Sequence, residues 1–213
     1  MTFYETMYRL FAGMMRTLYR VRVTGAENEP MEGPCLICAN HTSMSDVIIL
    51  SAVTHRRVRY MAKAELFRIP IISKFLSSLG AYSVRRGQND VGSIKRSVRL
   101  LSEGELVCIF PQGARKPKVD PRTTDVYSGA AMIASRAHAD VLPVYIKTKG
   151  NRTRLLRRTE VIFGRRIPYD EYSAHYGDGK YTDVIKYIFN KICELDYESS
   201  TPEIKDTSEA NKN

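Results

Sequence analysis

The sequence predicts an α/β protein: a single domain with a central, largely parallel or mixed sheet flanked by helices, plus an amphipathic helix at the N-terminus. Two observations carry this prediction. Short apolar, strand-like runs alternate with helix-like stretches along most of the chain, as in strand–helix–strand units. The 213 residues suit one domain, and 43% hydrophobic residues are enough to build a sizeable core.

The N-terminal stretch, residues 3–19, is predicted to be an amphipathic helix. Apolar side chains recur at steps of three and four residues, which is the pattern of one helix face. They are Phe3, Met7, Leu10, Phe11, Met14 and Leu18, while Arg9, Arg16 and Arg20 fall on another side. Two interpretations stay open: a helix packed on its own domain, or an interfacial helix whose apolar side chains dip into lipid.

The first half of the domain is expected to alternate strand and helix. Residues 19–25 form a short strand candidate, and residues 34–40 form a buried strand, because their apolar run has no polar alternation. A helix at 45–53 and a strand at 57–62 follow. Residues 69–80 have the length of a helix and end on a glycine, a usual helix stop, and a short strand is predicted at 81–84.

The second half continues the alternation. Residues 89–104 give the clearest helix, with an apolar stripe at steps of three and four before Gly104. A buried strand at 105–111 precedes a loop rich in Pro, Lys and Gly, and a helix of small residues is predicted at 128–139. Strands follow at 140–148, where Pro143 indicates an edge strand or a bulge, and at 159–164. The last helix is predicted at 181–196.

The chain is strongly basic, with a formal net charge of +10 and a pI of about 9.5. This excess favours anionic partners, namely nucleic acid, an anionic membrane face or phosphorylated substrates, but its sign does not choose among them. The basic residues occur in clusters such as 55–59, 115–122 and 147–158. For most of them we expect a solvated surface.

The cysteines and the apolar runs exclude several classes of protein. Cys35 and Cys38 form a CxxC pair in a strand-like run, but no second pair completes a tetrahedral metal site. We therefore expect reduced, buried thiols and no metal. Neither a secretory signal nor a run of about 20 apolar residues is present. The expectation is a cytoplasmic protein without a membrane span, for which attachment to a membrane surface stays open.

A pair of polar residues interrupts the apolar stretch LICANHTSMSDVIIL at residues 36–50. His41 follows a predicted buried strand, and Asp46 lies at the start of the next predicted helix. One interpretation is a helix-capping box between Ser43 and Asp46. The other is a carboxylate that fixes the tautomer of the His41 ring and leaves its second nitrogen as a base. The spacing by itself does not decide between them.

Two further loops place positive charge after predicted strands. FPQGAR (110–115) puts Arg115 beyond a tight Pro–Gly turn, and GAYSVRRG (80–87) puts Arg85 and Arg86 at a strand end. Arginine is suited to forked recognition of phosphate. Carboxyl ends of parallel strands are where α/β sheets usually bind ligands, so both loops are candidate parts of one site.

The order of four blocks gives these motifs a common meaning. NHTSMSD, GAYSVRR, FPQGAR and VLPVYI follow one another as do the four blocks of the glycerolipid acyltransferase family. The chain most resembles 1-acylglycerol-3-phosphate O-acyltransferases of the PlsC type, with the HxxxxD motif in the first block. The resemblance covers roughly residues 25–170. The resemblance implies an acyltransferase domain (23–197), which follows the N-terminal helix (1–22, a membrane-surface candidate). The composition after about residue 198 is polar and predicts a disordered tail (198–213).

The resemblance also implies roles for individual residues. His41 would be the general base and Asp46 its orienting partner. Substrate would be bound by residues of the later blocks, namely Arg86, Phe110, Pro111, Gln112, Gly113 and Arg115, and by Lys63, which lies with Glu65 in the stretch MAKAELF. Pro143 would lie near the acyl chain. The implied reaction takes a fatty acyl group from acyl-CoA or acyl carrier protein to the free hydroxyl of lysophosphatidic acid, without a cofactor.

The third block departs from the family pattern, which usually carries Glu and Thr where this chain has Gln112 and Ala114. These differences motivate an alternative acceptor for the same chemistry: glycerol-3-phosphate, another lysophospholipid or a lyso-aminolipid. A basic nucleic-acid-binding module is a further alternative, but no recognisable binding motif supports it. We therefore expect lysophosphatidic acid, an acyl thioester and the anionic inner face of the cell membrane as partners, and no nucleic acid.

Overall fold

The described part of the chain in this computed structural model comprises residues 3–78, 80–84, 91–176 and 180–198, with the backbone alone for 3–9 and 198. Its strands are β1 (Val21–Thr24), β2 (Cys35–Ala39), β3 (Val58–Lys63), β4 (Tyr82–Val84), β5 (Leu106–Ile109), β6 (Asp140–Thr148) and β7 (Thr159–Phe163). The α-helices are α1 (Phe3–Leu18), α2 (Ser45–Val53), α3 (Pro70–Ser78), α4 (Val91–Ser102), α5 (Gly129–Ala137), α6 (Tyr169–Ser173) and α7 (Tyr181–Glu198).

The strands form one mixed sheet in the order β1-β7-β6-β2-β5-β3-β4. All neighbouring strands are parallel except β6 and β7, which pair antiparallel. The carboxyl ends of β2 to β6 therefore lie along one edge of the sheet, here called the carboxyl edge. Because β1 and β7 run the opposite way, they begin at this edge, and the last turn of α1 is brought to it.

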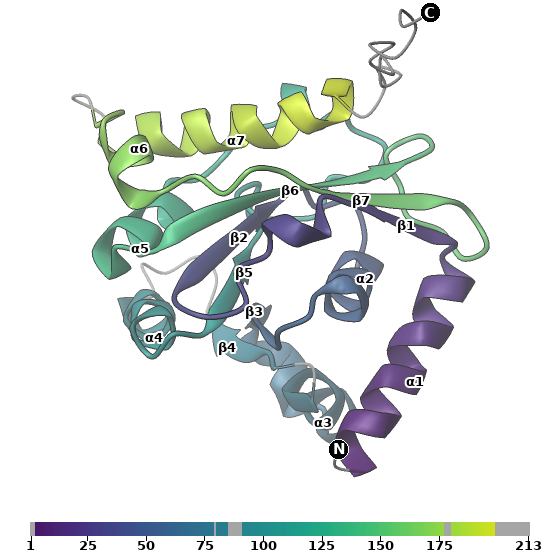
Figure 1. Cartoon of the computed structure of the whole chain (residues 1–213). Coiled ribbons are helices and arrows are strands. Elements are labelled where there is room, and N and C mark those ends of the chain that lie inside the picture. Colours follow the sequence, from purple (N-terminus) through teal and green to yellow (C-terminus); the bar gives the residue numbers. More distant parts are fainter. Residues whose placement is uncertain (1–2, 79, 85–90, 177–179, 199–213) are drawn as a thin grey trace, which may run out of the picture.

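Helices cover both faces of the sheet and give the fold three layers (Figure 1). Alternate strand residues point to opposite faces, so β2 contributes Leu36 and Cys38 to one core and Cys35 and Ile37 to the other. The first core includes side chains of α4, α5, α6 and α7, and the second includes side chains of α2. The single-domain α/β fold expected from the sequence is confirmed.

The element boundaries agree closely with the sequence-based prediction, and the helix expected at 45–53 has the bounds of α2. The short helix α6 and the 3₁₀ turns η1 (Ala26–Asn28), η2 (Ala64–Arg68) and η3 (Pro121–Thr123) were not predicted. Segments of three to five residues are too short to display a periodic pattern. The predicted disordered tail lies, apart from Glu198, outside the described residues.

The N-terminal helix packs on its own domain, which was one of the two interpretations of its sequence. Met15 and Leu18 pack against the second core, and the hydroxyl of Tyr19, just after the helix, lies 2.8 Å from Ser45 Oγ at the start of α2. Leu10 and Met14, by contrast, are 63% and 51% exposed. The helix is thus docked on the domain by one side and presents apolar side chains to solvent on another. No helix within the described ranges combines the length and apolar composition that a bilayer crossing requires.

Pro143 was predicted to mark an edge strand or a bulge, and the first of these is wrong. β6 lies inside the sheet between β7 and β2. The ladder with β7 begins at Val144 opposite Phe163, and beyond it the next paired residues are Val141 and Ile167. Two residues of β6 therefore face three on the other chain segment, which is a bulge. Proline is tolerated there because the ladder is already interrupted.

The cysteines are free and buried, as expected. Cys35 and Cys38 belong to the cores on opposite faces of the sheet, so they cannot bind one metal ion together. Burial raises the pKa of the Cys35 thiol to about 12 and raises that of Cys38 as well. Among the described residues, no group of three or more His, Cys, Asp or Glu side chains could hold a metal ion.

Two arginines of the basic cluster at 55–59 are exceptions to the solvated surface that we expected for most basic residues. The guanidinium of Arg56 donates hydrogen bonds to the carbonyls of Pro30, Gly33 and Gly104. Arg59 donates to the Glu105 carboxylate at 2.7 Å, and this bond holds the pKa of Glu105 below its usual value. These two cations join the chain segments around β3 and β5.

The turn after β1 allows a test of the packing between β1 and β7. Gly25 has φ 72°, and a Cβ there would lie 2.1 Å from the Phe163 carbonyl oxygen, whereas Gly33, at φ 77°, has open space around it. Left-handed strain costs an alanine about 1–2 kcal/mol at either position. We expect Gly25→Ala to lose about 1–3 kcal/mol more of the free energy of unfolding than Gly33→Ala. Urea denaturation measures both, and equal losses would contradict the expectation.

Candidate active site

The strand register brings two predicted site residues to the same level of the carboxyl edge. Cys38 of β2 pairs with Ile109 of β5. His41 and Gln112 each lie three residues further along the chain. The backbone N–H of His41 donates a 2.7 Å hydrogen bond to Gln112 Oε1. The parallel pairing of β2 and β5 is thus what assembles the first and third sequence motifs into one site.

His41 and Asp46 form a direct side-chain pair. His41 Nδ1 lies 3.0 Å from Asp46 Oδ2. Both residues are buried: His41 is 8% exposed, and Asp46 is completely buried. An oxygen acceptor at Nδ1 places the proton of the neutral ring on that nitrogen. Nε2 then carries the free lone pair. The geometry is that of a base whose tautomer is fixed by a carboxylate.

The carboxylate of Asp46 is held by several donors besides His41. Oδ2 accepts the backbone N–H groups of Thr42 at 2.6 Å and Ser43 at 2.8 Å. Oδ1 accepts the hydroxyl of Thr153 at 2.8 Å, and the Thr42 hydroxyl lies 3.3 Å from it. A buried carboxylate needs such partners to offset its loss of hydration. These bonds leave Asp46 a single position, and through it they orient the ring of His41.

Of the two interpretations of Asp46, the structure shows the contact with His41 and only one bond of the capping box. The Ser43 N–H donates to the same oxygen that faces His41, which is one half of a capping box. The other half differs from the box, because Ser43 Oγ accepts from Ser45 N at 3.2 Å and not from Asp46 N. The helix itself begins at Ser45, with Met44 at its N-cap and no side-chain cap bond, so the predicted capping box is wrong in this respect. Asp46 instead fixes the backbone just before α2 and binds His41.

The loop after β5 completes the setting of His41. The Phe110 ring stacks on the imidazole with 3.9 Å between centroids and an interplanar angle of 14°. The backbone N–H of Lys116 donates to the His41 carbonyl at 2.8 Å. Gly113 turns the loop with φ 64°, and a Cβ there would lie 2.9 Å from the Tyr127 ring. The loop thus holds His41 from both its ring face and its backbone.

Gln112 is almost fully buried, at 1% exposure. Its Oε1 serves His41, and its Nε2 donates to Thr124 Oγ1 at 2.8 Å. The hydroxyl of Thr124 in turn donates to the Pro121 carbonyl. Both ends of the amide are therefore occupied by the protein, and the side chain acts on the backbone of His41.

The remaining predicted site residues fall into three groups. Pro111 is buried, and its carbonyl accepts the N–H of Tyr127 at 2.9 Å, so it shapes the loop. Arg115 and Lys63 are exposed, Lys63 as the last residue of β3 and Arg115 in the loop after β5, and both strands end at the carboxyl edge. Arg86 lies outside the described residues.

Sequence reasoning missed three residues that support the pair. Asn40, which is fully buried, exchanges two hydrogen bonds with the backbone of Ile146 and so fixes the chain just before His41. Thr42 and Thr153 bind Asp46. Asn40 and Thr42 adjoin His41 in the sequence and could have been noticed for that reason. Thr153 lies more than 100 residues away in a basic loop, where no sequence signal marked it.

Comparisons with known proteins place this site in a family. The Acyltransferase family profile matches residues 20–147. The chain is 34% identical over 142 residues to the 1-acyl-sn-glycerol-3-phosphate acyltransferase of Bacillus subtilis, with 64% of this chain and 69% of that protein covered. It is 28% identical over 152 residues to a chloroplast protein of the same name from Brassica napus, with 70% of this chain and 43% of that protein covered.

A solved structure agrees at the level of the fold. The lysophosphatidic acid acyltransferase PlsC of Thermotoga maritima superimposes with a TM-score of 0.65 at 19% identity, covering 92% of this chain and 84% of that chain. The chain belongs to the Acyltransferase family, and it is an acyltransferase. The family match contains His41, Asp46 and the loop after β5, whereas Thr153 lies beyond it.

The bond from Thr153 to Asp46 allows a matched test. Thr153→Val removes a hydrogen bond to a carboxylate, and we expect the free energy of unfolding to fall by about 1.5–3 kcal/mol. Thr159 is an equally buried threonine whose hydroxyl has no hydrogen-bond partner among the described residues. Thr159→Val should therefore be neutral or stabilising. Urea denaturation compares the two, and similar losses for both would refute a special role of Thr153.

Proposed function

We propose that the protein transfers a fatty acyl group from a thioester to the free hydroxyl of 1-acylglycerol-3-phosphate and so makes phosphatidic acid for phospholipid biosynthesis. The observation that carries the proposal is the 3.0 Å contact between His41 Nδ1 and the fully buried Asp46 carboxylate. It occurs at the HxxxxD positions of a chain that belongs to the Acyltransferase family. Relatives named 1-acyl-sn-glycerol-3-phosphate acyltransferases support the choice of acceptor.

In the proposed mechanism, His41 Nε2 takes the proton of the acceptor hydroxyl as the oxygen attacks the thioester carbonyl. Asp46 stabilises the imidazolium that forms, through the bond to Nδ1. Collapse of the tetrahedral intermediate breaks the carbon–sulfur bond, and His41 returns the proton to the leaving thiolate. No covalent acyl-enzyme is required, because the acceptor hydroxyl itself is the nucleophile.

Charge complementarity suggests how the substrates are held. The acceptor bears a phosphate, and the donor, whether acyl-CoA or acyl carrier protein, is also anionic. Arg115 and Lys63 are exposed cations near the carboxyl edge, and we assign them, with Arg86, to the phosphate. Phe110 is assigned to the substrate side of His41. The protein would meet its lipid acceptor as a peripheral protein on the inner face of the cell membrane, with Leu10 and Met14 of α1 exposed toward lipid.

Catalysis by His41 is tested by acyl transfer to lysophosphatidic acid from acyl-CoA and from acyl carrier protein. We expect His41→Ala to lower kcat by roughly 10²–10⁴-fold, and Asp46→Asn to lower it as well, because the amide cannot accept all the bonds that the carboxylate accepts. His175→Ala is the control, since His175 is exposed and stacks on Tyr187. Full activity of His41→Ala would refute the mechanism, and an inactive wild type would point to another acceptor.

The two hydrogen bonds of the Gln112 side chain predict that this residue affects the rate of acyl transfer and not the choice of acceptor. The Gln112 amide forms hydrogen bonds with the backbone N–H of His41 and with Thr124. We expect Gln112→Ala to lower kcat by roughly tenfold or more, because the backbone of His41 loses about one hydrogen bond. The KM for lysophosphatidic acid and the preference for it over glycerol-3-phosphate should stay unchanged. Steady-state kinetics with both acceptors check this. A switch of acceptor in Gln112→Glu would show instead that position 112 reads the acceptor.

A further inference from the structure

The loop between β6 and β7, residues 149–158, is held at the carboxyl edge by three contacts. Thr153 donates to Asp46 Oδ1 at 2.8 Å. The Lys118 N–H donates to the Asn151 carbonyl at 2.8 Å, and the Leu156 N–H donates to the Leu18 carbonyl at the end of α1 at 2.7 Å. The loop therefore lies beside both the His41–Asp46 pair and the C-terminal end of α1. Figure 1 shows its position next to the end of α1.

Two adjacent leucines stand at the tip of this loop. Leu155 and Leu156 are 58% and 68% exposed, and the Arg157 N–H bonds the Arg154 carbonyl across them, so they are the central residues of a turn. Leu156 has φ 60°, which is unusual for a bulky side chain. This strained turn is bonded to the end of α1, the helix that also exposes Leu10 and Met14. An exposed pair of leucines in such a turn indicates an apolar surface that meets a partner.

Basic side chains flank the two leucines in the loop and line a hollow. A hollow of about 510 Å³ is lined by Gly150 and by five basic side chains, namely Lys118, Lys149, Arg152, Arg154 and Arg157. None of the five forms an ion pair with a described acidic residue. Their charges are therefore available to an anionic partner.

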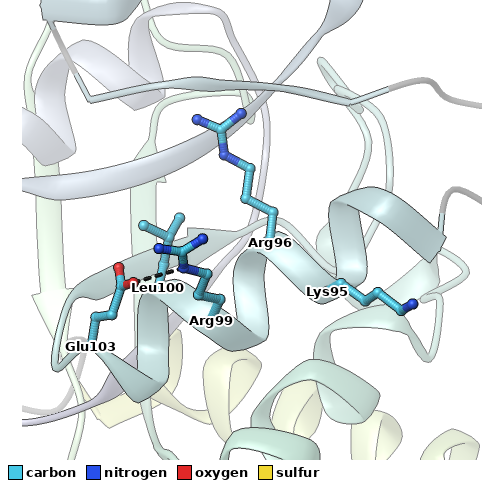
Figure 2. A pocket seen from close by; sticks show the side chains of 5 residues that line it. All are labelled: Lys95, Arg96, Arg99, Leu100 and Glu103. Carbon is cyan, nitrogen blue, oxygen red and sulfur yellow. Dashed lines mark hydrogen bonds and ion pairs between the residues drawn. The ribbon is translucent and has the colours of Figure 1, made fainter.

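A second basic hollow, on α4, lacks this combination. Figure 2 shows Lys95, Arg96 and Arg99 around it, with Arg99 bonded to Glu103. Arg96 lies over the Tyr82 ring at 5.3 Å. Glu103 lies just before β5 begins, so this end of the hollow is at the edge of the sheet opposite to His41. Two of its three cations thus have partners within the protein, and it serves as a natural control.

We propose that loop 149–158 is a second membrane-contact element: Leu155 and Leu156 enter the acyl boundary of an anionic bilayer, and the basic hollow binds headgroup phosphates. Leucines flanked by arginines match the layering of a bilayer interface, in which apolar groups lie below anionic ones. A nucleic acid would use the cations and leave the leucines in water. The choice of a lipid surface rests on the proposed lipid acceptor.

This assignment also places the bilayer relative to the chemistry. Arg152 and Arg154 flank Thr153, which binds the carboxylate that orients His41. The loop that touches lipid is thus the loop that supports Asp46. Together with the exposed side of α1, it turns the carboxyl edge of the sheet toward the membrane surface.

Insertion of the leucines can be measured by the fluorescence of one introduced tryptophan, because the chain contains no tryptophan of its own. We expect the emission of Leu155→Trp to shift to shorter wavelength on addition of vesicles that contain phosphatidylglycerol. Met31→Trp is the control, since Met31 is 68% exposed but precedes β2 at the opposite edge of the sheet. An unshifted emission from Leu155→Trp, or an equal shift from both variants, overturns the proposal.

The role of the cations is tested by co-sedimentation of the full chain with phosphatidylcholine vesicles, with and without phosphatidylglycerol. Arg154→Gln/Arg157→Gln should weaken binding to the anionic vesicles by roughly 30-fold, whereas Lys95→Gln/Arg99→Gln, with the same loss of charge on α4, should bind like wild type. Equal weakening by both pairs overturns the proposal. So does unchanged vesicle binding, whether or not the loop pair loses affinity for an oligonucleotide.

These experiments fail separately from the proposed function. Vesicle binding needs no acyl transfer, so an intact loop effect with an inactive enzyme would overturn only the reaction. Conversely, acyl transfer by a wild type whose loop variants bind vesicles normally would overturn only the loop assignment. Thermal unfolding of each variant checks that the fold is kept. Leu155→Ser is an additional variant, which removes one leucine and leaves every charge in place.

Discussion

The buried carboxylate of Asp46 is the constraint on which the rest of the site depends. It is wholly removed from solvent, yet it accepts hydrogen bonds from the backbone before α2, from Thr153 and from the ring of His41. The same set of bonds fixes the backbone before a helix, fixes a tautomer and attaches the β6–β7 loop, so the geometry that we propose for catalysis is part of the fold.

The support for His41 is shared between its carboxylate partner and the loop after β5. Gln112 and Lys116 hold the backbone of His41, and Phe110 lies against its ring. The loop that contains the third sequence block therefore holds His41, the residue that we propose as the base, and Gln112 takes part in this contact. The glutamine that departs from the family pattern forms, in the structure, a hydrogen bond to the backbone of His41.

The sheet topology brings the proposed lipid contacts and the proposed catalytic pair to the same edge of the sheet. The carboxyl ends of the parallel strands gather His41 and the loop after β5, while the reversed direction of β1 and β7 brings the end of α1 and the β6–β7 loop to the same edge. An enzyme acting on a lipid acceptor benefits from this arrangement, because the base then lies beside the surfaces that we assign to the bilayer.

The sequence by itself determined the alternation of strands and helices and the buried thiols, and it singled out His41 and Asp46, which the structure pairs. Periodicity, burial and short motifs are local properties of a chain. The sequence did not determine the interior position of Pro143, the structural use of Arg56 and Arg59, or the bond from Thr153 to Asp46. These depend on strand order and on contacts between segments far apart in sequence. Only the tertiary structure could decide them, since a buried polar group takes its partner from whichever segment the fold places beside it.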